Sequence, residues 1–283
     1  MGNQMFQYAF GRRMAADLRT TLKIDLSLLL DRARGKDHVY REYDLTIFKV
    51  PHEFVMSPAM LRTLYKTRSS AVCKLVRKRV GRNKTHIKEP HFHVSEDLLK
   101  NPIDNAIYDG WWQSERYFEP IAEEIQKVFE FVNPIEKTSA ALLQQIHETQ
   151  SVCLNVRRTD FLVTSNLNTT DKDYFLRGVK KIADQVSDPH FFIFSDDVEW
   201  CAANLNLDYP TVLVDHGHKG EKFGNYMQLM KACKHYIIPN SSFAWWAIWL
   251  NQQEEKIVIA PKRWFNDSSI NTDDLVPKDW WRL

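Results

Sequence analysis

The amino-acid sequence predicts an α/β fold with a parallel sheet, most clearly in its second half. Short apolar segments alternate there with longer segments whose apolar residues recur at helical spacing. Strands and helices that alternate in this way form parallel sheets covered by helices on both faces. Sheets of this kind bind ligands at the carboxyl ends of their strands, so we expect the functional residues there.

The first half of the chain predicts fewer regular elements. A helix is expected after residue 4, because Phe6, Phe10 and Met14 recur at intervals of four residues. The other elements expected here are a buried strand at 22–25, a loop at 40–50, a basic helical segment at 62–88, an aromatic strand and turn at 108–118, and a helix at 121–129.

The second half predicts five strands and five helices after the Asn133-Pro134 turn signal. The strands are expected at 152–156, 190–194, 211–214, 235–239 and 256–260. The helices are expected at 137–149, 173–185, 199–205, 225–233 and 243–251. We therefore predict two domains, residues 1–136 and 137–283, the second of which carries the regular sheet.

The composition bounds the class of protein. The chain has 283 residues, 44% apolar and 26% charged, which fits two globular domains of ordinary size. The net charge of +2 gives no reason to expect a nucleic-acid partner. The four cysteines are far apart, which argues against a zinc site or a disulfide framework and predicts a cytoplasmic protein. The sequence opens with no signal peptide, and its most apolar tract, 243–250, is too short to cross a bilayer.

The positive charge is concentrated in residues 62–88. This segment contains ten Lys or Arg residues and no Asp or Glu, interleaved with Leu and Val. Two interpretations stay open. The segment could contact an anionic inner membrane from the cytoplasmic side, or it could be a solvated helix and loop.

The strongest motif, Asn155-Val156-Arg157-Arg158-Thr159-Asp160, ends a predicted strand. Arginine presents planar, permanently charged donors that suit the oxygens of a pyrophosphate. Such cations would also stabilise a nucleoside diphosphate as it leaves a sugar. Asp160 would orient one arginine or the loop. The alternative is a surface arginine pair with a nearby capping carboxylate.

A second motif, Ser195-Asp196-Asp197, follows the next predicted strand. A carboxylate at this position can accept two hydrogen bonds from the N1–H and N2–H₂ edge of guanine, and Ser195 could reach a ribose or a phosphate. The alternative is an N-cap for the helix that follows. The two interpretations are compatible.

Two further segments are candidates for ligand binding. Asn240, Ser241, Ser242 and Phe243 open a predicted helix, where exposed N–H groups and hydroxyls can bind an anion. Gly2, Asn3 and Gln4 precede the first helix, where a glycine permits close approach and the amides can bind sugar hydroxyls. A plain helix cap would look the same.

No metal is expected. The pairs His91/His93 and His216/His218 are the only histidine clusters in the sequence, and neither has carboxylates or cysteines at ligand spacing.

Several runs together carry a resemblance to a known family. In order they are GNQMFQYAFG, REYDLTIF, GWWQSERYF, NVRRTDF, FSDDVEWC and LMKACKHYIIPNSSFAWWAIWL. They resemble the bacterial α-1,2-fucosyltransferases of glycosyltransferase family 11, across nearly the whole chain. The resemblance implies a GT-B-like fold of two Rossmann-like domains with the active site in the cleft between them. It also implies GDP-β-L-fucose as donor, no metal, and inversion to an α-linkage on O2 of galactose.

The resemblance also assigns roles to residues. Arg157 and Arg158 match the pyrophosphate-binding arginines, and Asp196 and Asp197 match the region that holds guanosine. The segment 240–243 matches the loop around the phosphates and fucose. Asn3 and Gln4 match the loop that faces the reaction centre.

The sequence departs from the family at two places. Asn155 stands where the family has a histidine, and it cannot accept a proton near neutral pH. The family places a short apolar strand before Gly-Asn-Gln; here either that strand is missing from the first sheet or another segment replaces it. No residue is singled out as general base, although Asp17, Asp109 and Glu115 are candidates.

The expected partners are GDP-fucose and a galactose-terminated oligosaccharide or lipid-linked glycan, as in O-antigen synthesis. A transferase of α-1,3 or α-1,6 linkage and a non-catalytic nucleotide-sugar-binding module are the alternatives.

Overall fold

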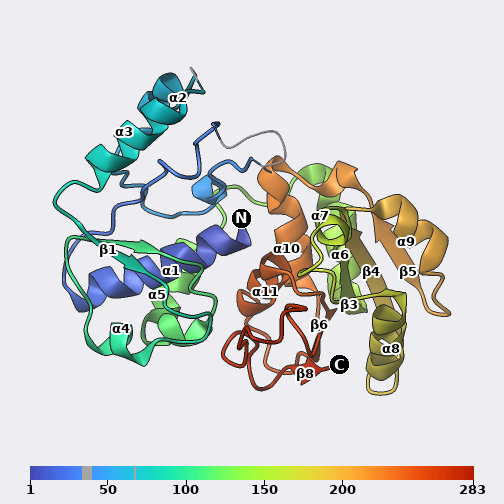
Figure 1. The fold of residues 1–283 in the computed structure, drawn as a ribbon. Helices are drawn as coiled ribbons and strands as arrows, with labels where there is room; N and C mark the ends of the chain where they lie inside the picture. The colour runs from blue at the N-terminus through green and yellow to red at the C-terminus, as the bar shows by residue number, and fades with distance from the viewer. Residues whose placement is uncertain (34–39, 67) are drawn as a thin grey trace. The chain divides into compact units, whose positions relative to one another are not determined.

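The computed structural model describes residues 1–33, 40–66 and 68–283, apart from the side chain of Asp160. The chain forms two compact units, a first unit at Asn3–Glu130 and a second unit at Phe131–Leu283 (Figure 1). Each unit has its own sheet, and each is described by itself below. No helix among the described residues combines the length and apolar character needed to cross a membrane.

The second unit contains a six-stranded sheet in which every neighbouring pair is parallel. Across the sheet the strands are β5 (Thr211–Val214), β4 (Pro189–Ser195), β3 (Gln150–Val156), β6 (His235–Ile237), β7 (Val258–Ala260) and β8 (Trp281–Arg282). Counted along the chain within this unit, that order is 3-2-1-4-5-6, the order of a Rossmann sheet. The predicted parallel sheet is therefore confirmed, and its switch point lies between β3 and β6.

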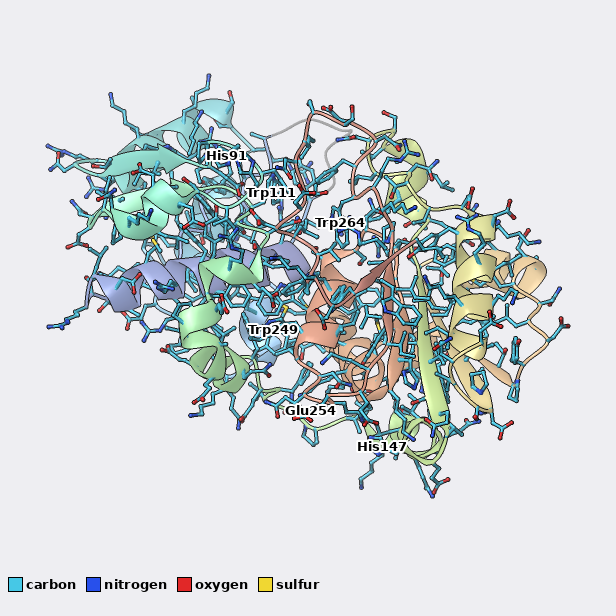
Figure 2. The ribbon with its side chains drawn as sticks, turned by 90° about the horizontal axis from the view of Figure 1, so that it is seen from below. His91, Trp111, His147, Trp249, Glu254 and Trp264 are labelled. Carbon is cyan, nitrogen blue, oxygen red and sulfur yellow. The ribbon has the colours of Figure 1, made fainter. Side chains whose placement is uncertain are left out.

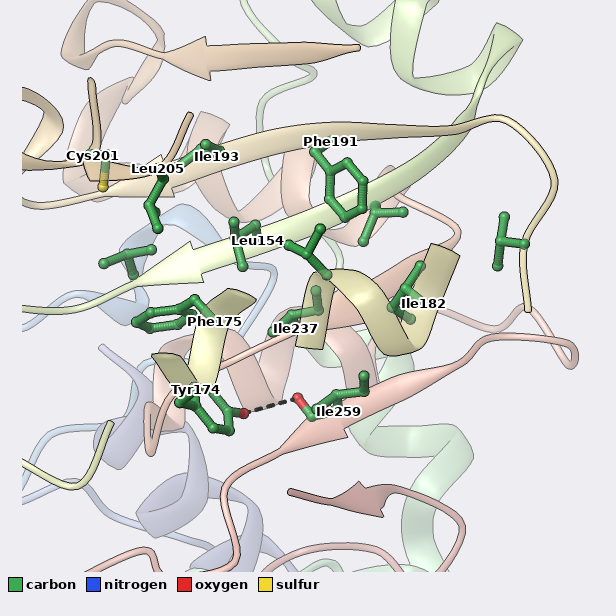
Figure 3. Close-up of a cluster of buried hydrophobic side chains, with 14 residues drawn as sticks. Leu154, Tyr174, Phe175, Ile182, Phe191, Ile193, Cys201, Leu205, Ile237 and Ile259 are labelled. Atoms are coloured by element: carbon green, nitrogen blue, oxygen red, sulfur yellow. Dashed lines mark hydrogen bonds between the residues drawn. The ribbon is translucent and has the colours of Figure 1, made fainter. Parts of the chain in front are cut away.

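Helices α8 (Lys172–Ala183) and α9 (Val198–Asn204) contribute to a core on one face of this sheet. Side chains of a strand point alternately to the two faces of a sheet, so every second side chain of β3 and β4 joins this core. Tyr174 anchors α8 to the sheet, because its hydroxyl donates to the carbonyl of Ile238 at 2.6 Å and lies 3.5 Å from that of Ile259 (Figure 3).

Helix α10 (Gly224–Ala232) packs on the opposite face, where the ring centroids of Tyr226 and of Phe194 on β4 lie 5.5 Å apart. Trp245 and Trp246 of α11 (Ser242–Trp249) are fully buried and belong to the core. The remaining helices of the second unit are α6 (Ala140–Glu148) and α7 (Thr159–Val163). Short 3₁₀ turns lie at Lys137–Ser139, His216–His218 and Glu221–Phe223.

The first unit is mostly helical and carries a parallel sheet of two strands, β1 (Thr85–Lys88) and β2 (Ala106–Asp109). Its helices are α1 (Gly2–Asp17), α2 (Pro58–Tyr65), α3 (Ser70–Val80), α4 (Glu96–Lys100) and α5 (Ala122–Val128), with 3₁₀ turns at Leu45–Ile47, Glu115–Tyr117 and Glu119–Ile121.

Three expectations for the first unit need correction. The strand expected at 22–25 is a single bridge between Ile24 and Phe54. The sheet is also smaller than a Rossmann-like sheet, because it has only the two strands β1 and β2, of which β1 is largely exposed and β2 half-buried. The basic segment 62–88 forms parts of three elements, α2, α3 and β1, rather than one helix.

All four cysteines are buried free thiols: Cys73 in the first unit, and Cys153, Cys201 and Cys233 in the second.

Candidate functional site

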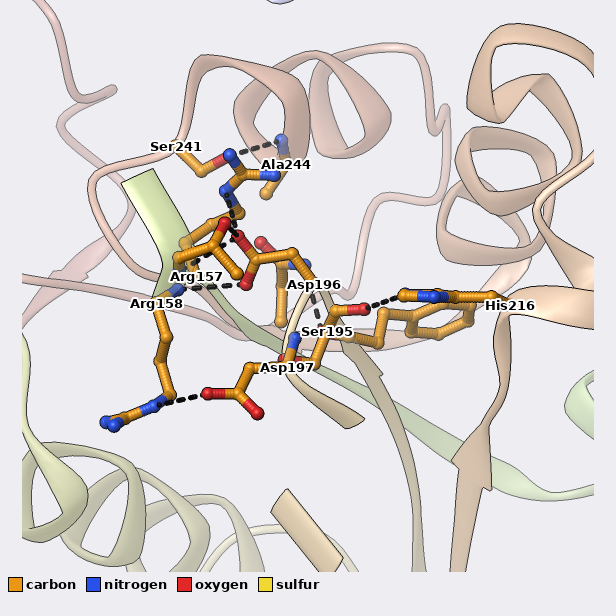
Figure 4. A network of polar contacts seen from close by, with 11 residues as sticks. Arg157, Arg158, Ser195, Asp196, Asp197, His216, Ser241 and Ala244 are labelled. Carbon is orange, nitrogen blue, oxygen red and sulfur yellow. Dashed lines mark hydrogen bonds and ion pairs between the residues drawn. The ribbon is translucent and has the colours of Figure 1, made fainter. Parts of the chain in front are cut away.

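The candidate site lies at the carboxyl ends of β3 and β4, beside the switch point of the second unit. Val156 and Ser195 are partners in the register of these strands, so the residues after them leave the sheet side by side. Arg157 and Arg158 follow one strand, and Asp196 and Asp197 follow the other (Figure 4). The sequence predicted this meeting from the position of both motifs at strand ends.

Asp196 organises the arginine loop. One carboxylate oxygen accepts the main-chain N–H of Arg158 at 2.9 Å. The other accepts the N–H and the hydroxyl of Thr159, at 3.3 and 2.5 Å, and pairs with Nε of Arg157 at 3.4 Å. These contacts fix the main chain from which both guanidiniums project.

Asp197 serves two purposes. Its Oδ1 accepts the N–H of Trp200 at 3.1 Å and so caps α9, as the N-cap interpretation predicted. Its Oδ2 pairs with Nε of Arg158 at 3.1 Å. The Arg158 guanidinium also lies over the Trp200 ring, 3.8 Å from its centroid, which holds it by a cation–π contact. Trp200 was missed from the sequence, although FSDDVEWC places it four residues after Asp196.

The two arginines are half-buried, with side chains 29% and 23% exposed. Each guanidinium meets a carboxylate through Nε, and Figure 4 shows the Nη end of Arg158 pointing away from Asp197. The aspartates thus orient the cations. An anion with several oxygens is the ligand that this arrangement suits best.

Ser195 and His216 brace the end of β4. The Ser195 hydroxyl accepts the N–H of Asp197 at 2.9 Å, and its carbonyl lies 3.1 Å from Nε2 of His216. His216, considered from the sequence only as a metal ligand, is therefore a neighbour of the site. Among the described residues, no group of three or more His, Cys, Asp or Glu side chains could hold a metal ion.

Two buried asparagines flank the switch point. Asn155 of β3 donates through Nδ2 to the carbonyl of Phe194 at 3.1 Å. Asn240, after β6, donates to the carbonyls of Leu167 and Trp264 at 2.9 and 2.8 Å. The Oδ1 atoms of both asparagines are buried and accept no hydrogen bond. A buried acceptor without a donor is costly, so each is suited to receive a donor from water or a ligand.

The segment after Asn240 starts α11. The Ser241 hydroxyl accepts the N–H of Ala244 at 3.4 Å and caps the helix, while Ser242 and Phe243 are partly exposed in its first turn. The side chain of Asp160 lies outside the described part of the structure, so its predicted role is not placed.

Asn3 and Gln4 lie at the start of α1 in the first unit. The Gln4 amide donates to the carbonyl of Glu42 at 2.7 Å and accepts the N–H of Asp44 at 2.9 Å. Asn3 accepts a hydrogen bond from the side chain of Gln113 at 2.8 Å. Both amides therefore organise loops of this unit, and their roles at a reaction centre stay predictions.

A parallel sheet in Rossmann order with charged loops at its switch point is the architecture of nucleotide-binding α/β proteins, although a fold alone does not define a reaction. The family model described as glycosyl transferase family 11 matches residues 82–283. The chain therefore belongs to this family of glycosyltransferases.

Known relatives match over different lengths. The Escherichia coli protein named alpha-1,2-colitosyltransferase is 28% identical over 297 residues, 100% of this chain and 96% of that protein. The Escherichia coli O-antigen biosynthesis glycosyltransferase WbnK is 25% identical over 98% of this chain and 97% of its own length. The mouse galactoside alpha-(1,2)-fucosyltransferase 1 is 23% identical over 58% of this chain and 45% of its own length. No solved structure matches the chain.

Proposed function

We propose that this glycosyltransferase transfers L-fucose from GDP-β-L-fucose to O2 of a terminal β-galactose with inversion at C1. The observation that carries the proposal is the pair Arg157 and Arg158, which Asp196 and Asp197 hold at the switch point of a Rossmann sheet. Membership of family 11 and relatives named as α-1,2-transferases support the linkage.

In the proposed reaction, galactose O2 attacks fucose C1 while the bond from C1 to the β-phosphate oxygen breaks. The electron pair of that bond stays with GDP, and the proton of O2 passes to a base. Arg157 and Arg158 stabilise the charge that develops on the departing diphosphate. Because two fixed guanidiniums supply positive charge there, we propose that transfer proceeds without a metal ion.

We propose that each unit binds one of the two substrates. The second unit would hold the GDP moiety, with Ser195, Asn240, Ser241, Ser242 and Phe243 around the phosphates and the sugar. The first unit would hold the acceptor, in an arrangement of the GT-B type. Asp196 and Asp197 both bond the arginine loop, and we propose that the same region contacts guanosine.

A colitosyl donor is the second candidate, because the relative that matches 100% of this chain is named alpha-1,2-colitosyltransferase. Colitose is L-fucose without the 3-hydroxyl group. A site built to hydrogen-bond that hydroxyl would reject GDP-colitose, whereas an apolar site would accept it. Parallel assays with both donors therefore decide between the two functions.

The basic segment 62–88 supports a peripheral contact with anionic lipid near a lipid-linked glycan. On α3 the buried Cys73, Val76 and Val80 share one face, while Lys74, Lys78, Arg79 and the 67% exposed Leu75 are on the other. Flotation with liposomes of increasing anionic content tests this. Equal recovery with neutral and anionic lipid would remove the proposal, as would unchanged binding of a variant with Glu at positions 74, 78 and 79.

Donor turnover tests the main proposal. Purified protein is incubated with GDP-fucose and lactose in EDTA, and released GDP and the linkage of the product are measured. We expect an α-1,2-linked product from the native chain and none from Arg158→Ala. Lys180→Ala, a surface cation of α8 that pairs with Asp184, is the matched control and should keep full activity. A folded, fully active Arg158→Ala protein would overturn the assignment.

A further inference from the structure

Trp111 exposes a large aromatic ring on the first unit (Figure 2). Its side chain is 51% exposed, and it is the most exposed tryptophan among the described residues. A single exposed apolar residue is ordinary and by itself needs no explanation. What sets Trp111 apart is the number of interactions that fix the turn on which it lies.

The turn is held by a carboxylate from the neighbouring strand. Glu89 follows β1 and accepts the main-chain N–H groups of Trp111 at 2.7 Å and of Trp112 at 3.0 Å. Burial raises the pKa of Glu89, against the effect of these two hydrogen bonds. On the other side of the turn, the carbonyl of Gly110 accepts a hydrogen bond from the Gln7 amide at 2.8 Å.

The residue after Trp111 is in an unusual backbone conformation. Trp112 has φ of 55°, in the left-handed region that a bulky side chain rarely adopts. It is 1% exposed and stacks on Phe10 of α1 with centroids 4.0 Å apart and planes 5° from parallel. This packing holds the strained residue in place, and such strain concentrates at functional sites.

Gly110 lets the main chain of the turn lie close to Glu89 and to the Trp112 ring. A Cβ at this position would lie 2.5 Å from Cβ of Glu89 and 2.8 Å from the Trp112 ring. The turn therefore closes on Glu89 only with glycine. As a result, the side chain of Trp112 points into the core and that of Trp111 points outward.

We propose that the outward ring of Trp111 is a stacking platform for a pyranose ring of the acceptor glycan, and that Glu89 is the residue that positions it. The inference rests on the proposed function. An indole face suits the C–H face of galactose, whose hydroxyls stay at the rim of the ring. The exposed Asp109 carboxylate and His91, close to Glu89 and Trp111 in the chain, provide polar groups of the kind that bind such hydroxyls.

The test compares Trp111→Ala, Trp111→Phe and Glu89→Ala in the full chain, with Met60→Ala on α2 (54% exposed) as the exposed apolar control. We expect Trp111→Ala to raise KM for lactose about tenfold, as the loss of one aromatic contact predicts. The KM for the donor and kcat at saturating lactose should change less than about twofold, because the ring acts in binding. The lactose KM of Trp111→Phe should be intermediate, and that of Met60→Ala should be unchanged.

Glu89→Ala leaves the indole present but releases its main chain. We expect a rise in the lactose KM with little change in the donor KM, a pattern that general destabilisation would not produce. An unchanged lactose KM in folded Trp111→Ala would overturn the platform, whatever the result for Glu89→Ala.

A second readout separates this inference from the proposed function. Lactose binding is followed directly by saturation-transfer NMR, without donor and without turnover. If the native chain binds lactose through Trp111 but transfers no sugar, the transferase proposal fails and the platform stands. If the chain transfers fucose while Trp111→Ala binds and uses lactose as the native chain does, the platform fails alone.

Discussion

The carboxylate of Asp196 accepts the main-chain N–H of Arg158 at 2.9 Å, so the end of β4 is bonded to the loop that leaves β3. The same carboxylate pairs with Nε of Arg157. One side chain therefore sets both the path of the loop and the direction of a guanidinium.

Removal of this carboxylate should loosen the loop more than it destabilises the fold. We expect Asp196→Ala to lower kcat/KM about 100-fold, since small displacements of catalytic groups have effects of that size. Asp196→Asn keeps an acceptor for the Arg158 N–H and should lose less. Steady-state kinetics and GDP titration measure both effects. Native activity in Asp196→Ala would contradict the positioning role.

Helix α8 approaches β6 so closely that only glycine fits at position 178. A Cβ there would lie 2.8 Å from Cγ2 of Ile237. We expect Gly178→Ala to destabilise the second unit by about 1 kcal/mol, because overpacking of about 1–3 kcal/mol exceeds the gain in helix propensity.

A double-mutant cycle tests the cause. In an Ile237→Ala background the clash is gone, so Gly178→Ala should become neutral or stabilising in urea unfolding. Equal effects in both backgrounds would show that contact with Ile237 is not the reason.

Tyr174 ties α8 to the carboxyl ends of β6 and β7. Its hydroxyl is buried and donates to the carbonyl of Ile238 at 2.6 Å. Tyr174→Phe should reduce the free energy of unfolding by about 1–2 kcal/mol, because a buried acceptor loses its donor. Phe175→Leu is the control, because Phe175 is also buried in α8 and its change removes no hydrogen bond. A Tyr174→Phe protein as stable as the native chain would contradict this account.

Acid should destabilise the second unit through two half-buried imidazoles, those of His235 and His190. Burial lowers the pKa of His235 from its ordinary value of 6.5, and the nearby Lys234 lowers it further. Burial also lowers the pKa of His190. The unfolded chain therefore binds more protons than the folded chain below pH 6.5, and stability is lost as the pH falls through that value.

His235→Asn separates this contribution. The neutral ring accepts the N–H of Ile257 at 3.1 Å through Nδ1, and the Asn carbonyl can replace that acceptor without titrating. The free energy of unfolding, measured by urea titration at several values between about pH 5 and 7.5, should change less steeply with pH for His235→Asn than for the native chain. If its dependence on pH is the same in both proteins, groups other than His235 cause it.

The second unit could be predicted closely from its sequence, because its strands are short apolar runs between periodic helices. The strand predicted at 211–214 coincides with β5, and that predicted at 190–194 lies within β4. The two-residue β8 was missed, since Trp281 and Arg282 carry no strand pattern. In the first unit β1 has Ile87 as its one apolar residue and was missed, whereas β2 ends at Asp109 and overlaps only the start of the strand predicted at 108–118.

The site was predicted in outline but not in its bonds. Strand ends brought the arginines and aspartates together as expected, since parallel topology requires it. The sequence could not reveal that Asp196 bonds the main chain of Arg158, or that Trp200 lies over its guanidinium. Those contacts depend on rotamers and loop paths that packing decides.

Each unit contains a buried thiol whose reactivity can report when that unit unfolds. Burial raises the pKa of Cys73 to about 11 in the first unit and that of Cys201 to about 11 in the second. Alkylating reagents attack thiolates, so neither residue should react at neutral pH until its surroundings open. Pulsed alkylation read by peptide mass spectrometry would then time the opening of the first and the second unit independently, within one molecule and without added labels.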